Sequence, residues 1–348
     1  MTARPLAHAE APGLHALAER VLLAPDAGFA MRGRVVTIGI ALLALLAVPE
    51  LTALLVRERA LHADRRFWRS WTRTGAHRRA LQADAAATDG AALARAIETV
   101  ALAPRLFRTY LDANVAFAID HGALPGDLAD GFVVFTRRFA ERGVTARLRR
   151  TIETAAPDAR GLPSLDERLR ALPASAAIPD AARAIDLLDF DHGAWLAHEI
   201  RARFATDAAL VAWADIPARI LAPAIVSRAA ALSARLAPIV PEASFATVHA
   251  ALAAGRVAEI AAALEPRLVN LPDAERSELV PETVANALVP LFSAALLTHG
   301  ATITSVLGEE SPCFRHRAAI VSPLLIVLGA MADGPAAPTL ATWASALR

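Results

Sequence analysis

The 348-residue sequence contains no lysine: all 36 of its Lys and Arg positions are arginine. A chain without lysine cannot form the Schiff base used by pyridoxal-phosphate enzymes and imine-forming aldolases. It also lacks the lysine with which P-loop proteins and protein kinases hold nucleotide phosphates. These classes of enzyme are therefore excluded by composition.

Cysteine and aromatic residues are scarce as well. The one cysteine, Cys313, permits no disulfide within the chain and excludes zinc or iron–sulfur sites built from several cysteines. Aromatic residues make up 5% of the chain and alanine and leucine dominate, which favours helices over strands. A formal net charge of +1 gives no global reason to expect nucleic acid as a partner. We expect an all-α protein, with no nucleic-acid partner and no cofactor.

The longest apolar run is Val35–Val56, in which Glu50 is the only charged residue. About 20 apolar residues in a helix cross the hydrocarbon core of a bilayer, so the run predicts one N-terminal transmembrane helix. Eight arginines lie in the segment 57–79 that follows, against four before the run. By the positive-inside rule this places most of the chain in the cytoplasm, at the inner membrane if the protein is bacterial.

A second apolar region covers residues 284–332. Val284–Leu307 carries no Asp, Glu or Arg, and Ala318–Ala332 is strongly apolar but short for a span. The region forms either a membrane hairpin or a buried hairpin of a helical domain, and its shortness favours the buried hairpin. An acid inside a span marks a functional site by default. An ion or proton path would use four polar residues of the two regions: Glu50, Thr298, His299 and Thr302.

Directly after the predicted span, aromatic side chains alternate with arginines. Rings at the headgroup level and guanidinium groups on lipid phosphates are typical of a membrane-surface helix. The same pattern would also suit a nucleic-acid patch, or a tryptophan pair packed into a helical domain. The predicted membrane-surface residues are Arg65, Arg66, Phe67, Trp68, Arg69, Trp71 and Arg73.

The densest acidic stretch contains Asp186, Asp189 and Asp191. Asp186 and Asp189 are three residues apart and would share one face of a helix, so a divalent-metal enzyme is one hypothesis. The simpler interpretation is that Asp191 caps the next helix.

The predicted organisation has six parts. They are an N-terminal segment (1–34), the transmembrane helix (35–56), a basic juxtamembrane and first helical subdomain (57–156), a Pro-rich linker (157–179), a second helical subdomain ending in the apolar hairpin (180–332), and a tail (333–348). The linker contains one short helix, Ser164–Leu172. We expect a membrane-anchored helical protein with the lipid bilayer and membrane proteins as partners, acting as a non-catalytic subunit or scaffold of an envelope complex. The alternatives are an ion-conducting subunit and a metal enzyme.

Overall fold

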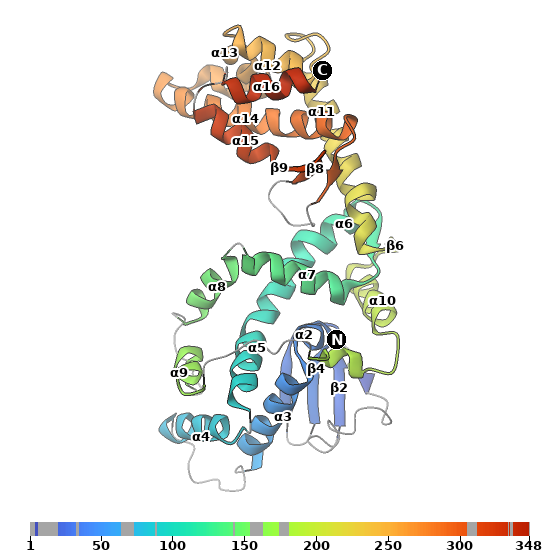
Figure 1. The fold of residues 1–348 in the computed structure, drawn as a ribbon, viewed down its shortest axis with the longest axis vertical. Coiled ribbons are helices and arrows are strands. Elements are labelled where there is room, and N and C mark those ends of the chain that lie inside the picture. Colours follow the sequence, from blue (N-terminus) through green and yellow to red (C-terminus); the bar gives the residue numbers. More distant parts are fainter. Residues whose placement is uncertain are drawn as a thin grey trace. The chain divides into compact units, whose positions relative to one another are not determined.

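The computed structural model of the protein has two compact units, Met1–Trp213 and Ala214–Arg348. The structure describes residues 4–5, 20–32, 35–63, 73–87, 89–141, 143–153, 163–173, 181–304, 312–332, 334 and 337–347. Most of this part of the chain is helical, as predicted, and three small sheets accompany the helices (Figure 1). About half of the predicted linker 157–179, namely 157–162 and 174–179, lies outside the described residues, and the linker stays a prediction.

The N-terminal unit begins with a four-stranded sheet in the order β1-β2-β4-β3. Its strands are β1 (Arg4–Pro5), β2 (Arg20–Ala24), β3 (Phe29–Arg32) and β4 (Val35–Gly39). β4 pairs in parallel with β2 and antiparallel with β3. The turn between β2 and β3 passes so close to Gly39 that a Cβ atom there would lie 2.2 Å from the carbonyl oxygen of Asp26. This close approach requires glycine at the end of β4.

The prediction of a transmembrane helix over Val35–Val56 is wrong. The run forms β4, then α2 (Ile40–Leu45), and after a break it enters α3 (Val48–Ala63). β-branched residues fill the first four positions, which favours a strand, and Pro49 lies in the first turn of α3, where proline is tolerated. The apolar side chains of the run supply much of the core of this unit. Burial within the protein therefore accounts for its hydrophobicity.

Helices complete the N-terminal unit. They are α4 (Arg73–Ala85), α5 (Gly90–Tyr110), α6 (Ala116–Asp120), α7 (Leu128–Glu141), α8 (Val144–Glu153), α9 (Leu165–Arg170) and α10 (His192–Phe204), with a π-helical turn η2 (Leu111–Val115), a 3₁₀ turn η3 (Ala184–Leu187) and a parallel pair of short strands, β5 (Ala123–Pro125) and β6 (Ala209–Val211). Helix α9 confirms the predicted short helix. Ser164 caps it in a capping box with Glu167.

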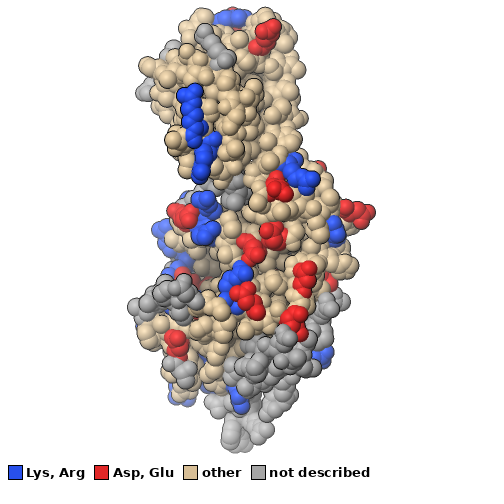
Figure 2. Space-filling view, turned by 45° about the vertical axis from the view of Figure 1, so that its right-hand side comes forward, with Lys and Arg blue, Asp and Glu red and all other residues tan. Residues whose placement is uncertain are grey.

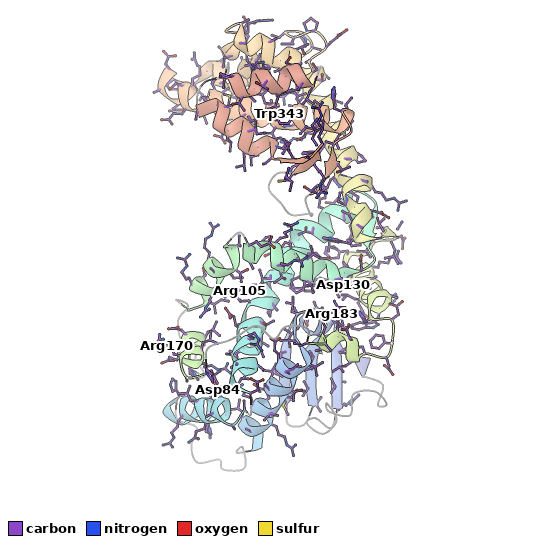
Figure 3. All side chains as sticks on the ribbon, viewed as in Figure 1. Asp84, Arg105, Asp130, Arg170, Arg183 and Trp343 are labelled. Atoms are coloured by element: carbon purple, nitrogen blue, oxygen red, sulfur yellow. The ribbon has the colours of Figure 1, made fainter. Side chains whose placement is uncertain are left out.

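The C-terminal unit is built around α14 (Asp273–Thr298), against which α11, α12, α13 and α15 pack. Its elements are η4 (Trp213–Asp215), which begins at the last residue of the first unit, η5 (Pro217–Leu221), α11 (Ala222–Leu236), α12 (Phe245–Ala253), α13 (Val257–Leu264), η6 (Pro266–Asn270), α14, β7 (Thr302–Ile303), β8 (Phe314–His316), β9 (Ala319–Val321), α15 (Pro323–Ala332) and α16 (Pro338–Ala346). Phe292 of α14 stacks on Phe245, with ring centroids 4.6 Å apart, and contacts Trp343 of α16. Trp343 is labelled in Figure 3.

The apolar region 284–332 does not form a simple helical hairpin. Between α14 and α15 lies an antiparallel sheet, β7-β8-β9, and the run Ala318–Ala332 is divided between β9 and α15. Helix α15 has 10 residues, about half the length that crosses a bilayer. Whether α14 or α15 touches lipid depends on which of their faces the unit leaves uncovered.

Candidate membrane-contacting surface

Two helical segments among the described residues are long and apolar enough to cross a membrane. They are Trp213–Leu236, with a mean hydropathy of 1.2, and Asp273–Thr298, with a mean hydropathy of 1.5. The core helix of a water-soluble protein can have the same length and composition. The buried share of each segment therefore indicates whether its apolar side chains belong to a protein core or to a surface that could contact lipid.

The interior of the C-terminal unit explains the hydropathy of α14. Half of its most apolar stretch is buried, and Val284, Leu288 and Phe292 are at most 1% exposed. Because this helix lies at the centre of the unit, its composition needs no membrane. Its weak amphipathic pattern follows from contacts on several sides.

Packing does not explain the hydropathy of Trp213–Leu236, since only 17% of its apolar stretch is buried. Within α11 the buried residues are Ala229 and Leu236, whereas Val226 is 50% exposed. Arg228 is also exposed, near the middle of the helix. An arginine at that position would be costly at the centre of a bilayer, so this geometry suits a helix that lies at the membrane surface better than one that crosses it.

A second exposed apolar cluster lies on β9 and α15. Ile320 is 69% exposed, Leu325 70% and Leu328 50%. On α15 the buried positions are Pro323, Val327 and Ala330. Leu325 and Leu328 are three residues apart and point away from this buried face. We call Ile320, Leu325 and Leu328 the apolar patch.

Charged side chains are unevenly distributed between the units. The visible face of the C-terminal unit is mostly uncharged, whereas acidic and basic side chains are interspersed over the N-terminal unit (Figure 2). No acidic residue occurs from Pro312 to Ala332, the segment that carries the apolar patch. The only charged residues in that segment are two exposed arginines, Arg315 and Arg317.

Glu50 lies in the N-terminal unit, where it is 8% exposed. One carboxylate oxygen accepts a hydrogen bond from Arg95 Nε at 2.6 Å, and the other accepts from the backbone N–H of Ala47 at 2.9 Å. The carboxylate therefore caps α3 and pairs with α5. Burial together with these two contacts gives Glu50 a structural role in this unit.

The other predicted ion-path residues belong to the C-terminal unit. Thr298 and His299 are exposed at the end of α14, where each side chain hydrogen-bonds to a carbonyl oxygen of the preceding turn. Thr302 is exposed on β7. These three residues lie close together in the sequence at one end of the unit, and the ion path through them and Glu50 stays a prediction.

The three acidic residues proposed as weak metal ligands do not share a helix. Asp186 lies in η3 and pairs with Arg183, and the backbone becomes extended at Leu188, so Asp189 is outside the helix. The expectation that Asp186 and Asp189 share a helical face is thus wrong. Asp191 caps α10 by accepting from Ala194 N–H at 2.8 Å, as predicted. Among the described residues no three His, Cys, Asp or Glu side chains form a metal-binding group.

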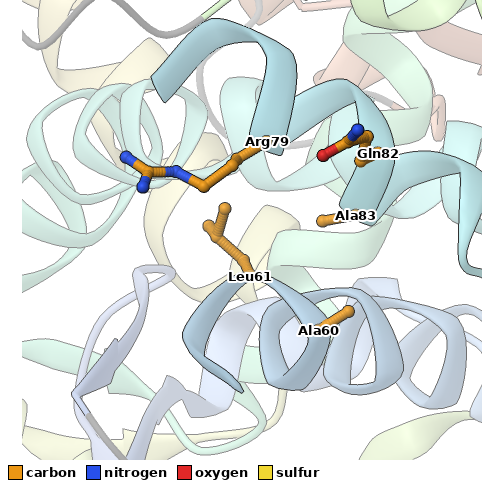
Figure 4. A pocket seen from close by; sticks show the side chains of 5 residues that line it. All are labelled: Ala60, Leu61, Arg79, Gln82 and Ala83. Carbon is orange, nitrogen blue, oxygen red and sulfur yellow. The ribbon is translucent and has the colours of Figure 1, made fainter. Parts of the chain in front are cut away.

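The predicted membrane-surface residues fall mostly outside the described part of the chain. Arg65, Arg66, Phe67, Trp68, Arg69 and Trp71 all lie there, and Arg73 begins α4 with a side chain that is not described. Their proposed role is unchanged as a prediction. A small pocket of about 230 Å³ lies between α3 and α4, lined by Ala60, Leu61, Arg79, Gln82 and Ala83 (Figure 4). Ligand sites typically measure about 300–1,000 Å³, so this pocket is small for one.

Two buried polar groups of the N-terminal unit were not predicted. Tyr110 is fully buried against Phe132 and Trp213, and its hydroxyl has no hydrogen-bond partner in the structure. Burial raises the pKa of Tyr110 well above its usual value, and the carboxylate of Asp127 raises it further. Asn114 is also fully buried, within η2, and neither amide atom has a partner. In the sequence, the position of Asn114 between the apolar residues Leu111 and Val115 was the signal that could have predicted its burial.

Comparison with known proteins gives no further guidance. No protein-family model, curated protein sequence or solved structure matches this chain. The exposed apolar surfaces of the C-terminal unit are therefore the features from which a function can be inferred.

Proposed function

We propose that this protein is a membrane-associated helical protein that acts as a non-catalytic subunit or scaffold at the bilayer. The observation that carries the proposal is the exposure of Trp213–Leu236, a segment whose most apolar stretch is only 17% buried. Water does not favour such a surface, whereas the interface between headgroups and acyl chains does. Lipid contact is assigned to the C-terminal unit and replaces the N-terminal anchor expected from the sequence.

The two-unit organisation supports a scaffold. The N-terminal unit has its own core and carries interspersed charges on its surface, which suits an aqueous environment. The C-terminal unit has a separate core and exposes the apolar segments. One unit can thus contact lipid while the other faces partner proteins in water.

Vesicle flotation of the full-length protein tests the proposal. Purified protein is mixed with phospholipid vesicles and centrifuged through a density gradient, and we expect it to rise with the lipid. A parallel sample without vesicles controls for aggregation. Protein that stays at the bottom of the gradient with vesicles, and is monodisperse without detergent, would contradict the proposal.

Extraction distinguishes surface association from a membrane span. If α11 lies at the membrane surface, as the exposed Arg228 favours, carbonate at high pH should release part of the bound protein. A crossing helix would resist carbonate and require detergent.

A further inference from the structure

The arrangement of β8, β9 and α15 points to a particular lipid surface. We propose that the apolar patch (Ile320, Leu325 and Leu328) inserts into the headgroup region of an anionic membrane, with Arg315 and Arg317 on the lipid phosphates. This inference rests on the proposed membrane association and names the site and the lipid class. It concerns shallow insertion at the surface, not a span.

The hairpin places an arginine and an apolar side chain on the same outer face. Arg315 of β8 is the cross-strand partner of Ile320 of β9, and both are exposed. The next pair, Phe314 and Val321, is at most 3% exposed and faces the core. Because directly paired residues project to the same side of a sheet, the Arg315–Ile320 pair presents a charge beside an apolar group.

Helix α15 follows β9 in the chain and has no polar side of its own. Its ten residues contain no charged or hydrogen-bonding side chain. A helix that is apolar all round is normally enclosed by protein or lipid. Here one face, at Pro323, Val327 and Ala330, packs inward, and the opposite face exposes Leu325 and Leu328. We therefore expect the exposed face of α15, with Leu325 and Leu328, to contact lipid.

Charge decides which partner fits this face. Arg317 occupies the β8–β9 turn with a backbone φ of 55°, and it is exposed like Arg315. Within the described segment Pro312–Ala332 these two arginines are the charged side chains; Glu309 and Glu310 precede the segment in the sequence and Asp333 follows it. Exposed apolar side chains next to these two exposed arginines complement a surface of lipid phosphates over acyl chains.

Site-specific fluorescence tests insertion in the full-length protein. In a Cys313→Ser background, Leu325→Cys is labelled with an environment-sensitive dye and mixed with vesicles of phosphatidylcholine and phosphatidylglycerol. Leu279→Cys is the matched control, because Leu279 is 40% exposed on α14 of the same unit, close to acidic residues. We expect a blue shift from the label at 325 and none from the label at 279. A silent label at 325, or equal shifts at both positions, would overturn the assignment.

Two sets of substitutions test the two parts of the surface. Ile320→Ser with Leu325→Ser and Leu328→Ser should lower the partition coefficient at least about tenfold, whereas Val269→Ser with Leu279→Ser should change it less than about twofold. Arg315→Gln with Arg317→Gln should lower binding to anionic vesicles by roughly fivefold per arginine and leave binding to pure phosphatidylcholine unchanged. Equal losses on both lipids would overturn the role of charge.

The outcomes separate this inference from the proposed function. Protein that floats with vesicles but is unaffected by either set of substitutions refutes the surface and leaves membrane association intact. Protein that never floats refutes both. If the serine substitutions instead convert a lipid-free oligomer into a monomer without changing flotation, the patch is a self-association surface and the lipid assignment is wrong.

Discussion

Replacing Asp84 with asparagine should destabilise the N-terminal unit more than any exposed charge substitution. Asp84 is 1% exposed and joins three helices (Figure 3). Arg57 Nε of α3 donates to it at 2.9 Å, and Arg168 of α9 donates through Nε and Nη2, each at 2.9 Å. The carboxylate on α4 therefore accepts three charge-assisted hydrogen bonds from two guanidinium groups.

The magnitude follows from this geometry. Removing one partner of a buried ion pair costs about 3–5 kcal/mol, because the remaining charge loses its compensation. Asparagine keeps one carbonyl oxygen as an acceptor, and Arg57 also contacts Glu58, so we expect a value near the lower end of this range. About 3 kcal/mol changes the folding equilibrium roughly 100-fold.

Urea denaturation followed by circular dichroism measures the change, and hydrogen exchange locates it in α4 and α9. Asp166→Asn is the matched control, since Asp166 of α9 pairs with Arg170, whose side chain is 72% exposed. That exposed pair should contribute less than about 0.5 kcal/mol. If Asp84→Asn is no more destabilising than Asp166→Asn, the buried network does not hold the three helices together.

Three other groups give further tests. Tyr110 is the one tyrosine of the chain, and burial raises its pKa. The folded protein should therefore show no tyrosinate absorbance at pH 10.5, whereas the urea-unfolded chain ionises near ~10. Since the unfolded state loses this proton first, stability should fall as pH rises above about 10, and a tyrosinate signal from the folded protein at that pH would refute the burial. For His249, burial lowers the pKa, so the unfolded chain binds the proton first and stability should fall as pH drops below about 6.5. His249→Gln should lose less thermal stability than the native chain between pH 7.5 and 5.5, and an equal loss would contradict this. Glu50→Gln should destabilise the N-terminal unit by about 2 kcal/mol, because the charge-assisted hydrogen bond from Arg95 is weakened; normal stability combined with loss of an ion-dependent function would favour the ion path instead.

Local sequence signals predicted local structure well. The short helix within 157–173 (α9) and the capping of α10 by Asp191 occur as expected, and α6 ends at Asp120 with His121 at its C-cap, directly before Gly122. Gly122 adopts a φ of 78°, a conformation that glycine tolerates best. These features depend on residues within one turn of each other, so a single sequence contains the information needed to predict them.

The failure at Val35–Val56 has a non-local cause. Length and hydropathy indicated a span, but residues 20–24 and 29–32 supply strands that pair with the first five residues of the run. Nothing within the run specifies those partners. The strand preference of Val35, Val36 and Ile38 was the available local signal, and the apolar length of the whole run outweighed it in the prediction.

The candidate surface was only partly predictable for the same reason. The sequence identified Ala318–Ala332 as strongly apolar, and its shortness argued against a span. Which side chains stay exposed depends on how α15 packs on α14, and composition does not determine this. The residues of the apolar patch could therefore be identified only from the structure.

The apolar run Val35–Val56 is buried in the N-terminal unit, whereas the apolar patch on β9 and α15 is exposed. This difference changes the orientation that we expect at the membrane. Val35–Val56 contributes to a protein core, so the arginines at 57–79 no longer flank a span and the positive-inside argument for a cytoplasmic location does not apply. Insertion through Leu325 and Leu328 would occur from one side and would leave both units on that side. The side of the membrane that the protein binds then depends on the compartment that contains the protein and on which leaflet carries anionic lipid.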